Sequence, residues 1–183
     1  NIHESNKRKV VVYTTCYVNY NLPEIATATL KVLEKNNINV EFVYPECCGM
    51  PKLEAGDLKS VVGKARRISS KLLPWVDKGY EILTLTPSCG LMLKSEWQLL
   101  DPENKVLKRI SDYTKDICEY VEELSREKGF IKGQNDIKKN ISLHIACHTK
   151  AQNIGVKSAD MLRTIPNLNI NLIDKCSGHG GSF

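Results

Sequence analysis

Short β-branched runs alternate along the chain with longer segments whose apolar residues recur at helical spacing. Such runs are typical of strands, and here they predict five, at 9–15, 39–44, 80–86, 140–146 and 168–174. Apolar residues three and four positions apart predict helices at 23–37, 53–73, 91–100, 103–128 and 154–164. Pro23 stands where the first helix should begin, and Pro74 is expected to end the second.

This alternation predicts an α/β fold with a mostly parallel sheet built from βαβ units. The chain also repeats itself, because a strand, a cysteine, a helix, a strand and a cysteine motif occur twice. Thirty residues separate Cys16 from Cys47 and twenty-eight separate Cys147 from Cys176. We therefore expect two pseudo-repeated lobes: a first cysteine-rich repeat with its connecting helix over 8–130, and the beginning of a second, truncated repeat over 138–183.

The charge pattern argues against nucleic-acid binding. The formal net charge is +5 over 183 residues, and basic and acidic residues are interspersed rather than clustered, which is typical of solvated helix faces and not of a nucleic-acid surface. No apolar run reaches the length of a membrane span, so any membrane contact should be indirect or made by missing segments. With neither an initiator Met nor a secretory signal, we expect a cytoplasmic fragment of a longer protein, peripheral at most on the cytoplasmic face of the membrane.

Cysteines carry the strongest chemical signal. There are seven, an odd number, and without an export signal such thiols are more often metal ligands or redox groups than disulfides. Since the carboxyl ends of parallel strands meet at one edge of a sheet, thiols that follow strands should meet there. Cys118 falls inside a helical pattern and is expected to be a packing residue. The six that follow predicted strands are Cys16, Cys47, Cys48, Cys89, Cys147 and Cys176.

The adjacent pair Cys47-Cys48 favours a multinuclear cluster over a single ion. Neighbouring cysteines form a disulfide only under strain, and a tetrahedral zinc usually takes ligands two to four residues apart. In a cluster, adjacent thiolates can bind different metal atoms, and soft thiolates suit iron–sulfur clusters, zinc or Cu(I). Gly49 lets the backbone pass close to a bulky group. An iron–sulfur cluster is therefore the preferred hypothesis, and zinc remains the alternative.

Five motifs together resemble the CCG-type cysteine-rich domains: "TTCYVNYN", "PECCGMPKLEAGDL", "TPSCGLMLKSEW", "ACHTKAQNIG" and "DKCSGHGGSF". These domains occur in the B subunit of heterodisulfide reductase, in lactate-utilisation iron–sulfur proteins and in the C subunit of anaerobic glycerol-3-phosphate dehydrogenase. The resemblance implies tandem repeats that bind cysteine-ligated iron–sulfur clusters and relay electrons. In the glycerol-3-phosphate dehydrogenase complex, electrons pass from a flavoprotein dehydrogenase towards membrane quinone.

The resemblance also implies which thiols act. Cys16 matches the isolated first cysteine, Cys47-Cys48 the CC pair and Cys89 the third segment, where a C-x-x-C of heterodisulfide reductase is reduced to one cysteine. Ser177 replaces the second cysteine of the later CCG motif. A four-cysteine site for a 4Fe-4S type cluster is therefore expected in the first repeat, with a noncubane form as the alternative. Cys147 and Cys176 are expected to face that cluster or to hold a second one.

Several polar residues near the later cysteines are further candidates. His148 and His179 are expected at the functional edge, where either could ligate metal or protonate a substrate or quinone, whereas His144 lies within a predicted strand and is expected to be structural. Lys150 could hold the loop or contact a bound group. In "KLEAGDL" the expected role of Asp57 is to stabilise the start of a helix.

The sequence thus predicts an iron–sulfur electron-transfer component of an oxidoreductase complex rather than a stand-alone enzyme. Its expected partners are a flavoprotein dehydrogenase or other redox subunits, and quinone is a candidate acceptor. Two alternatives stay open. The chain could be a subunit that reduces a disulfide or thiol at its cluster, or it could be a zinc-stabilised interaction module without a redox role.

Overall fold

The computed structural model describes residues 8–127, 129–131 and 137–178, and it confirms an α/β fold with parallel strands. The chain divides between Asp116 and Ile117 into two compact units, which we call the first and the second unit. Each unit contains its own parallel sheet, four-stranded in the first and two-stranded in the second.

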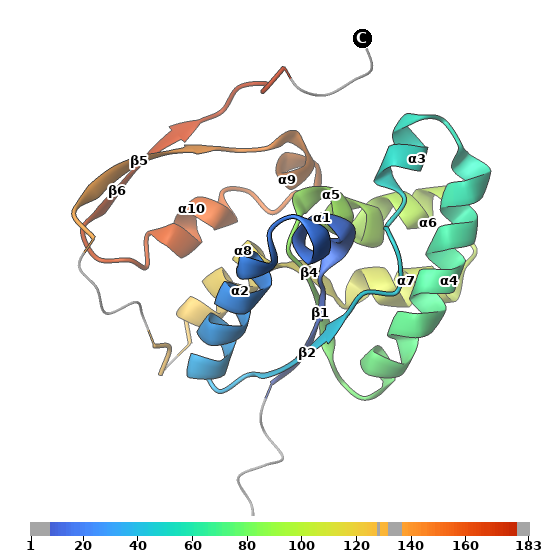
Figure 1. Ribbon diagram of the computed structural model, residues 1–183, viewed down its shortest axis with the longest axis horizontal. Coiled ribbons are helices and arrows are strands. Elements are labelled where there is room, and N and C mark those ends of the chain that lie inside the picture. Colours follow the sequence, from blue (N-terminus) through green and yellow to red (C-terminus); the bar gives the residue numbers. More distant parts are fainter. Residues whose placement is uncertain (1–7, 128, 132–136, 179–183) are drawn as a thin grey trace, which may run out of the picture. The chain divides into compact units, whose positions relative to one another are not determined.

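The sheet of the first unit has the strand order β2-β1-β3-β4, with all neighbours parallel. The central strand β1 is buried along Val10–Tyr13 because strands lie on both of its sides and helices on both of its faces (Figure 1). At its carboxyl end Tyr13 lies opposite Val43 and Thr84, so three strands end side by side. The strands are β1 (Lys9–Tyr13), β2 (Asn39–Val43), β3 (Glu81–Thr84) and β4 (Thr114–Asp116).

Helices pack on the two faces of this sheet (Figure 1). α1 (Thr15–Tyr20) and α2 (Pro23–Lys35) lie on one face, and Pro23 begins α2 as the sequence predicted. The long helix α4 (Leu58–Asp77) and α7 (Lys105–Asp112) lie on the other face. Short helical segments connect these elements along the chain. α3 (Met50–Glu54) precedes α4, and α5 (Pro87–Leu91), the π-helix η1 (Met92–Glu96) and α6 (Trp97–Leu100) precede α7.

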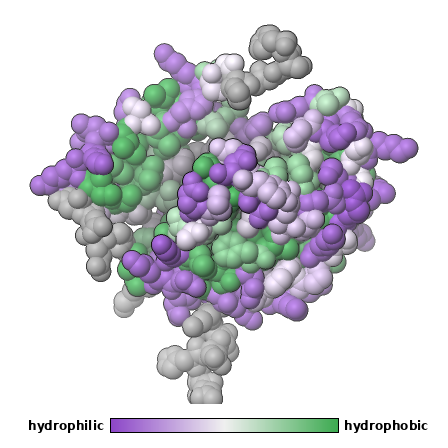
Figure 2. All heavy atoms as spheres, in the orientation of Figure 1, coloured by the Kyte–Doolittle hydropathy of each residue, from purple (hydrophilic) through white to green (hydrophobic). Residues whose placement is uncertain are grey.

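The main core of the first unit forms where α4 packs against the sheet. Val61, Ala65, Ile68 and Leu72 of α4 are fully buried against sheet residues such as Ile82. Each fully buried Val, Ile or Leu side chain contributes about 1.5–3 kcal/mol to folding. Hydrophilic residues cover the outer surface over α3 and α4, as expected for an amphipathic helix (Figure 2).

Asp57 confirms the expected role at a helix start. Its carboxylate oxygen Oδ1 accepts a hydrogen bond of 3.2 Å from the backbone N–H of Ser60, which makes it the N-cap of α4. The hydrogen bonds from Ser60, together with Lys52, lower the pKa of Asp57 below its usual range. The cap fixes the point at which the chain leaves α3 and enters the long helix.

Pro74 does not end α4, and this prediction was wrong. The helix continues to Asp77 with Pro74 inside it. The residues beyond the proline are anchored by packing: Val76 is buried in the core, and the ring of Trp75 meets that of Tyr80 edge to face at 5.1 Å. These contacts outweigh the backbone hydrogen bond that a proline removes.

The single helix predicted over 103–128 was also wrong. α7 ends at Asp112, and Thr114–Asp116 then form β4, a strand too short for its period to be visible in the sequence. β4 pairs with β3, and the side chains of Thr114 and Asp116 are buried. The predicted segment 91–100 is likewise divided between α5, η1 and α6, because its backbone widens into a π-helix at Met92–Glu96.

The second unit begins with α8 (Ile117–Ser125), which carries Cys118. Its sheet consists of β5 (Lys139–His144) and β6 (Leu168–Ile173), paired in parallel with His144 opposite Ile173. The predicted helix at 154–164 is shorter, as α10 (Lys157–Leu162), and α9 (Cys147–Ala151) precedes it. α8 packs against α10, so the range 8–130 predicted for the first repeat extends past the point where the chain divides.

Candidate metal centre

Four of the candidate cysteines gather at the carboxyl edge of the first sheet. The chain leaves β1 through a sharp turn in which Thr15, fully buried, has a left-handed φ of 66°. A β-branched residue adopts this conformation rarely and at a cost of about 1–3 kcal/mol. The hydroxyl oxygen of Thr15 accepts from the N–H of Val18 at 3.2 Å, which supports the turn. The turn places Cys16 in the first turn of α1, immediately beyond the sheet edge.

The loop that carries Cys47 and Cys48 is held from both sides. The hydroxyl of Tyr13, at the end of β1, donates to the carbonyl oxygen of Glu46. The indole Nε1–H of Trp97 donates to the carbonyl oxygen of Cys48 at 3.1 Å. Next in the chain, Gly49 has a left-handed φ of 96° that reverses the backbone into α3. The CC pair is therefore fixed by side chains from two distant elements.

A charge cluster anchors the same loop on the outside. The Glu46 carboxylate accepts two hydrogen bonds from Arg67, at 3.0 and 3.1 Å, and one from Lys64 at 2.9 Å. These bonds lower the pKa of Glu46 to about 2, so the carboxylate is charged at neutral pH. Both basic residues lie on α4, which ties the CC loop to the longest helix of the unit.

The four thiols lie near one another at this edge, and two of them are in contact. Cys89, in α5, has its Sγ 3.2 Å from the Sγ of Cys48, and only 4% and 2% of these residues is exposed. Cys47 is among the causes that raise the pKa of Cys16 and it also acts on the pKa of Cys48, so these three thiols lie near one another. The hydrogen bond with Cys89, followed by burial, raises the pKa of Cys48, and burial raises that of Cys16, so these two thiols are protonated in the metal-free protein at neutral pH.

This arrangement differs from a preformed site for one ion. Among the residues that the structure describes, no group of three or more His, Cys, Asp or Glu side chains is arranged to hold a single metal ion. The thiols of Cys16, the CC pair and Cys89 instead lie near one another at this edge. Four soft donors at one sheet edge, two of them buried, fit a group with several metal atoms such as an iron–sulfur cluster.

Aromatic side chains form one wall beside the thiols. Burial raises the pKa of Tyr13, with further contributions from Cys48, Cys89 and Cys47. Burial likewise raises the pKa of Tyr44 to about 12, with Cys16 as the next cause. The ring centroids of Tyr13 and Tyr44 lie 6.4 Å apart, and those of Tyr44 and Tyr20 lie 5.8 Å apart. The phenols of Tyr13 and Tyr44 remain neutral, so they add no charge beside the thiols.

Cys147 and Cys176 lie in the second unit, both exposed, after the carboxyl ends of β5 and β6. The segments that carry them are joined by an ion pair between Lys150 and Asp174 and by a hydrogen bond of 2.7 Å between Nε2 of His144 and the carbonyl oxygen of Lys175. His144 and Lys150 thus hold the loops together.

The remaining candidates stay predictions. His148 lies half-buried in α9, next to Cys147. Its carbonyl oxygen accepts from Nε2 of Gln152 at 3.3 Å. His179 lies outside the described residues. Cys118 is half-buried in α8, where its expected packing role is untested.

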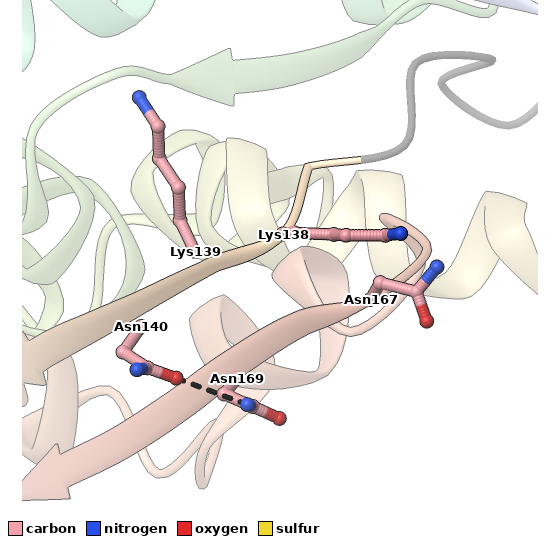
Figure 3. A pocket seen from close by; sticks show the side chains of 5 residues that line it. All are labelled: Lys138, Lys139, Asn140, Asn167 and Asn169. Atoms are coloured by element: carbon pink, nitrogen blue, oxygen red, sulfur yellow. Dashed lines mark hydrogen bonds between the residues drawn. The ribbon is translucent and has the colours of Figure 1, made fainter.

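A shallow pocket of about 390 Å³ lies elsewhere in the second unit, at the amino-terminal ends of β5 and β6 (Figure 3). Asn169 donates to Asn140 across the two strands at 3.0 Å. The cysteines follow the opposite ends of these strands, so the pocket is separate from them. Its lining residues are Lys138, Lys139, Asn140, Asn167 and Asn169.

Residues 10–94 match the family described as CCG, cysteine-rich domain. The chain is therefore similar to this family over residues 10–94. The matched range contains all four of the gathered cysteines and ends inside η1, so it coincides with the part of the first unit that builds the site. The resemblance inferred from the motifs is confirmed.

Three relatives extend the likeness to nearly the whole chain. The B subunit of a fumarate reductase (CoM/CoB) of Methanothermobacter marburgensis is 25% identical over 94% of this chain and 33% of its own length. An uncharacterized iron-sulfur protein of Methanocaldococcus jannaschii is 28% identical over 97% of this chain and 34% of its own length. The C subunit of the anaerobic glycerol-3-phosphate dehydrogenase of Escherichia coli K12 is 25% identical over 97% and 45%, respectively. The chain thus spans less than half of each of these relatives.

Sequence reasoning missed the residues that support the thiols. Tyr13, Glu46 and Trp97 act through contacts between segments far apart in the chain, so no local pattern marks them. The one available signal was Thr15, since "TTC" directly after a strand suggests a turn.

Within the described part of the chain, no helix is both long enough and apolar enough to cross a membrane.

Proposed function

We propose that Cys16, Cys47, Cys48 and Cys89 together bind an iron–sulfur cluster of the 4Fe-4S type, and that the protein is an electron-transfer component of an oxidoreductase complex. The observation that supports this most is the group of four thiols at one sheet edge, with Cys48 and Cys89 in contact at 3.2 Å. A bound cluster would accept and donate single electrons.

The chain's own residues would have three roles. The thiols lose their protons on binding, because the thiolate is the ligand, and the raised pKa of Cys48 means that binding releases a proton at neutral pH. Cys48 and Cys89 lie on the buried side of the site and exclude water there. Tyr13 and Trp97 would hold the CC loop through the carbonyl oxygens of Glu46 and Cys48, so the loop that carries two of the ligands is fixed before binding.

The proposal extends to the rest of the complex. A flavoprotein dehydrogenase or another redox subunit would supply electrons, quinone is the proposed acceptor, and the setting is the cytoplasm or the cytoplasmic face of the membrane. Cys147 and Cys176 would bind a second cluster, with His148 and His179 as proton donors. The relative from Escherichia coli, by name a subunit of anaerobic glycerol-3-phosphate dehydrogenase, supports this direction.

A redox titration tests the function. The anaerobically prepared protein is reduced stepwise while its visible absorption and electron paramagnetic resonance spectra are recorded. We expect a reversible one-electron transition that is absent from Cys89→Ser. A colourless protein that contains zinc without sulfide would instead indicate a zinc module. Turnover of a disulfide with a reduced dye would indicate a thiol or disulfide reductase.

A further inference from the structure

Two buried hydroxyl groups beside the thiols have no partner. Among the described residues, the side-chain oxygens of Thr14 and Thr86 are enclosed yet form no hydrogen bond. Thr14 as a whole is only 8% exposed. Buried polar groups are almost always satisfied, because an unpaired one loses its hydration without replacement. Two unpaired hydroxyls next to cysteine-bearing segments are therefore candidates to bind a group that the site takes up.

Both threonines stand where the chain leaves the sheet, at the edge where the thiols lie. Thr14 directly follows β1, and its backbone N–H bonds to the carbonyl oxygen of Val43 at 3.2 Å. Only Thr15 separates it from Cys16. Thr86 stands between β3 and α5, and its carbonyl oxygen accepts from the N–H of Gly90, the residue after Cys89, at 3.0 Å. Since β1 and β3 are neighbouring parallel strands, both threonines lie at the same carboxyl edge.

Three other buried threonines of the first unit have hydrogen-bond partners. The hydroxyl of Thr84 donates to the carbonyl oxygen of Lys115 at 3.4 Å, and that of Thr114 donates to the carbonyl oxygen of Ile110 at 2.7 Å. Thr15 accepts from Val18. The two threonines that adjoin the cysteine segments therefore differ from the buried threonines Thr84 and Thr114 of the same sheet.

We propose that Thr14 and Thr86 are positioning residues that donate hydrogen bonds to sulfur atoms of the bound cluster. This rests on the proposed function. The sulfur atoms of a cluster carry negative charge that increases on reduction, so a hydroxyl donor stabilises the reduced form more than the oxidised form and raises the reduction potential.

The test is the midpoint potential of the cluster in matched variants. Thr14→Val and Thr86→Val keep the shape of the side chain and remove the donor. Each should shift the potential to more negative values by the equivalent of about a three- to tenfold change in the equilibrium constant for reduction, and a tenfold change is about 59 mV for one electron. Thr14→Ser keeps a hydroxyl, so its potential should stay close to that of the unmodified protein. Thr84→Val and Thr114→Val remove satisfied hydroxyls and should leave the potential unchanged.

Stability of the metal-free protein supplies a second readout. Without the cluster, Thr14→Val and Thr86→Val should unfold at the same or a higher urea concentration than the unmodified protein, because they remove an unpaired buried hydroxyl. Thr114→Val should unfold at a lower concentration, because it loses a hydrogen bond.

The outcomes separate this inference from the function on which it rests. If the unmodified protein binds a cluster and both valine variants keep its potential, the inference is overturned while the function stands. The inference is equally overturned if the control variants shift the potential as much as the two threonines do. If the unmodified protein binds no iron after reconstitution, the proposed function fails and the inference fails with it.

Discussion

The indole N–H of Trp97 donates a hydrogen bond of 3.1 Å to the carbonyl oxygen of Cys48. Trp97 is 1% exposed, so this bond joins the buried start of α6 to the second residue of the CC pair. Since Cys89 lies on α5, earlier along the same helical run, one continuous element contacts the pair through both a side-chain donor and a thiol.

Replacing Trp97 with Phe should therefore disturb the site and not only the core. Trp97→Phe leaves the Cys48 carbonyl oxygen without this donor and opens a cavity, so we expect a loss of about 2–4 kcal/mol in the free energy of unfolding, measured with urea. The matched control is Trp75→Phe, a half-buried residue whose ring meets Tyr80, and it should cost less than half as much. Equal losses in the two variants would contradict the special role of Trp97.

Gly49 and Gly63 should respond to alanine in opposite directions. At Gly49 a Cβ has room, with its nearest contact at 3.5 Å, but the left-handed φ of 96° is unfavourable for alanine, so Gly49→Ala should destabilise the protein by about 1–2 kcal/mol. Gly63 lies inside α4 with a flexible Arg67 side chain as its neighbour, and Gly63→Ala should stabilise by about 0.5–1 kcal/mol. Thermal unfolding of both variants checks the signs, and a stabilising Gly49→Ala would mean that the turn is not required.

Alkylation of the reduced, metal-free protein should distinguish the exposed cysteines from the buried ones. Cys147 and Cys176 are exposed, whereas Cys48 and Cys89 react only when the structure opens locally. With iodoacetamide at neutral pH, we expect the exposed pair to be modified at least about tenfold faster, as followed by peptide mass spectrometry. Comparable rates at all four positions would show that Cys48 and Cys89 are not buried in solution.

The second unit should lose stability in acid through Glu122. This carboxylate of α8 is 5% exposed and pairs with Lys157 of α10 at 2.5 Å and with Arg126. Burial alone would raise the pKa of Glu122, but the two partners outweigh it and the pKa is lowered. Its stabilising effect is therefore complete at neutral pH, begins to fall near the ordinary glutamate pKa of about 4.3 and is lost as the pH drops through the lowered value.

Glu122→Gln tests this dependence. The variant should be less stable at pH 7 by about 1–2 kcal/mol, and the difference from the unmodified protein should shrink towards pH 3, as measured by urea unfolding followed at the helical signal. Glu119→Gln, on the same helix, is the control. A difference that stays constant across this pH range would contradict the assigned pKa shift.

The sequence predicted the strands and the gathering of four cysteines, for a physical reason. β-branched runs form parallel strands, and parallel strands end together, so Cys16, the CC pair and Cys89 had to meet at one edge. It did not predict β4, because Thr114–Asp116 is a strand only through its pairing with β3. It predicted two lobes, with Cys147 and Cys176 in the second, but it placed all six cysteines at one sheet edge, whereas the structure has a separate sheet in each unit.

The supporting contacts of the site were beyond sequence reasoning for a related reason. The bond from Tyr13 to Glu46 and the bond from Trp97 to Cys48 each depend on one donor meeting one carbonyl oxygen across many residues. Periodicity records which face of an element is apolar, and it does not record which carbonyl a buried tyrosine or tryptophan will reach. The Pro74 error has the same origin, because packing of Val76 and Trp75 decided where α4 ends.

The most direct test of the proposed cluster site is the content of iron and acid-labile sulfide per chain, measured on anaerobically prepared protein and on matched cysteine variants. We predict about four of each in the unmodified protein and in Cys118→Ser, and loss of both in Cys48→Ser and Cys16→Ser, with folding checked by circular dichroism. Iron and sulfide that persist in the folded Cys48→Ser and Cys16→Ser variants would contradict the claim that these thiols hold the cluster.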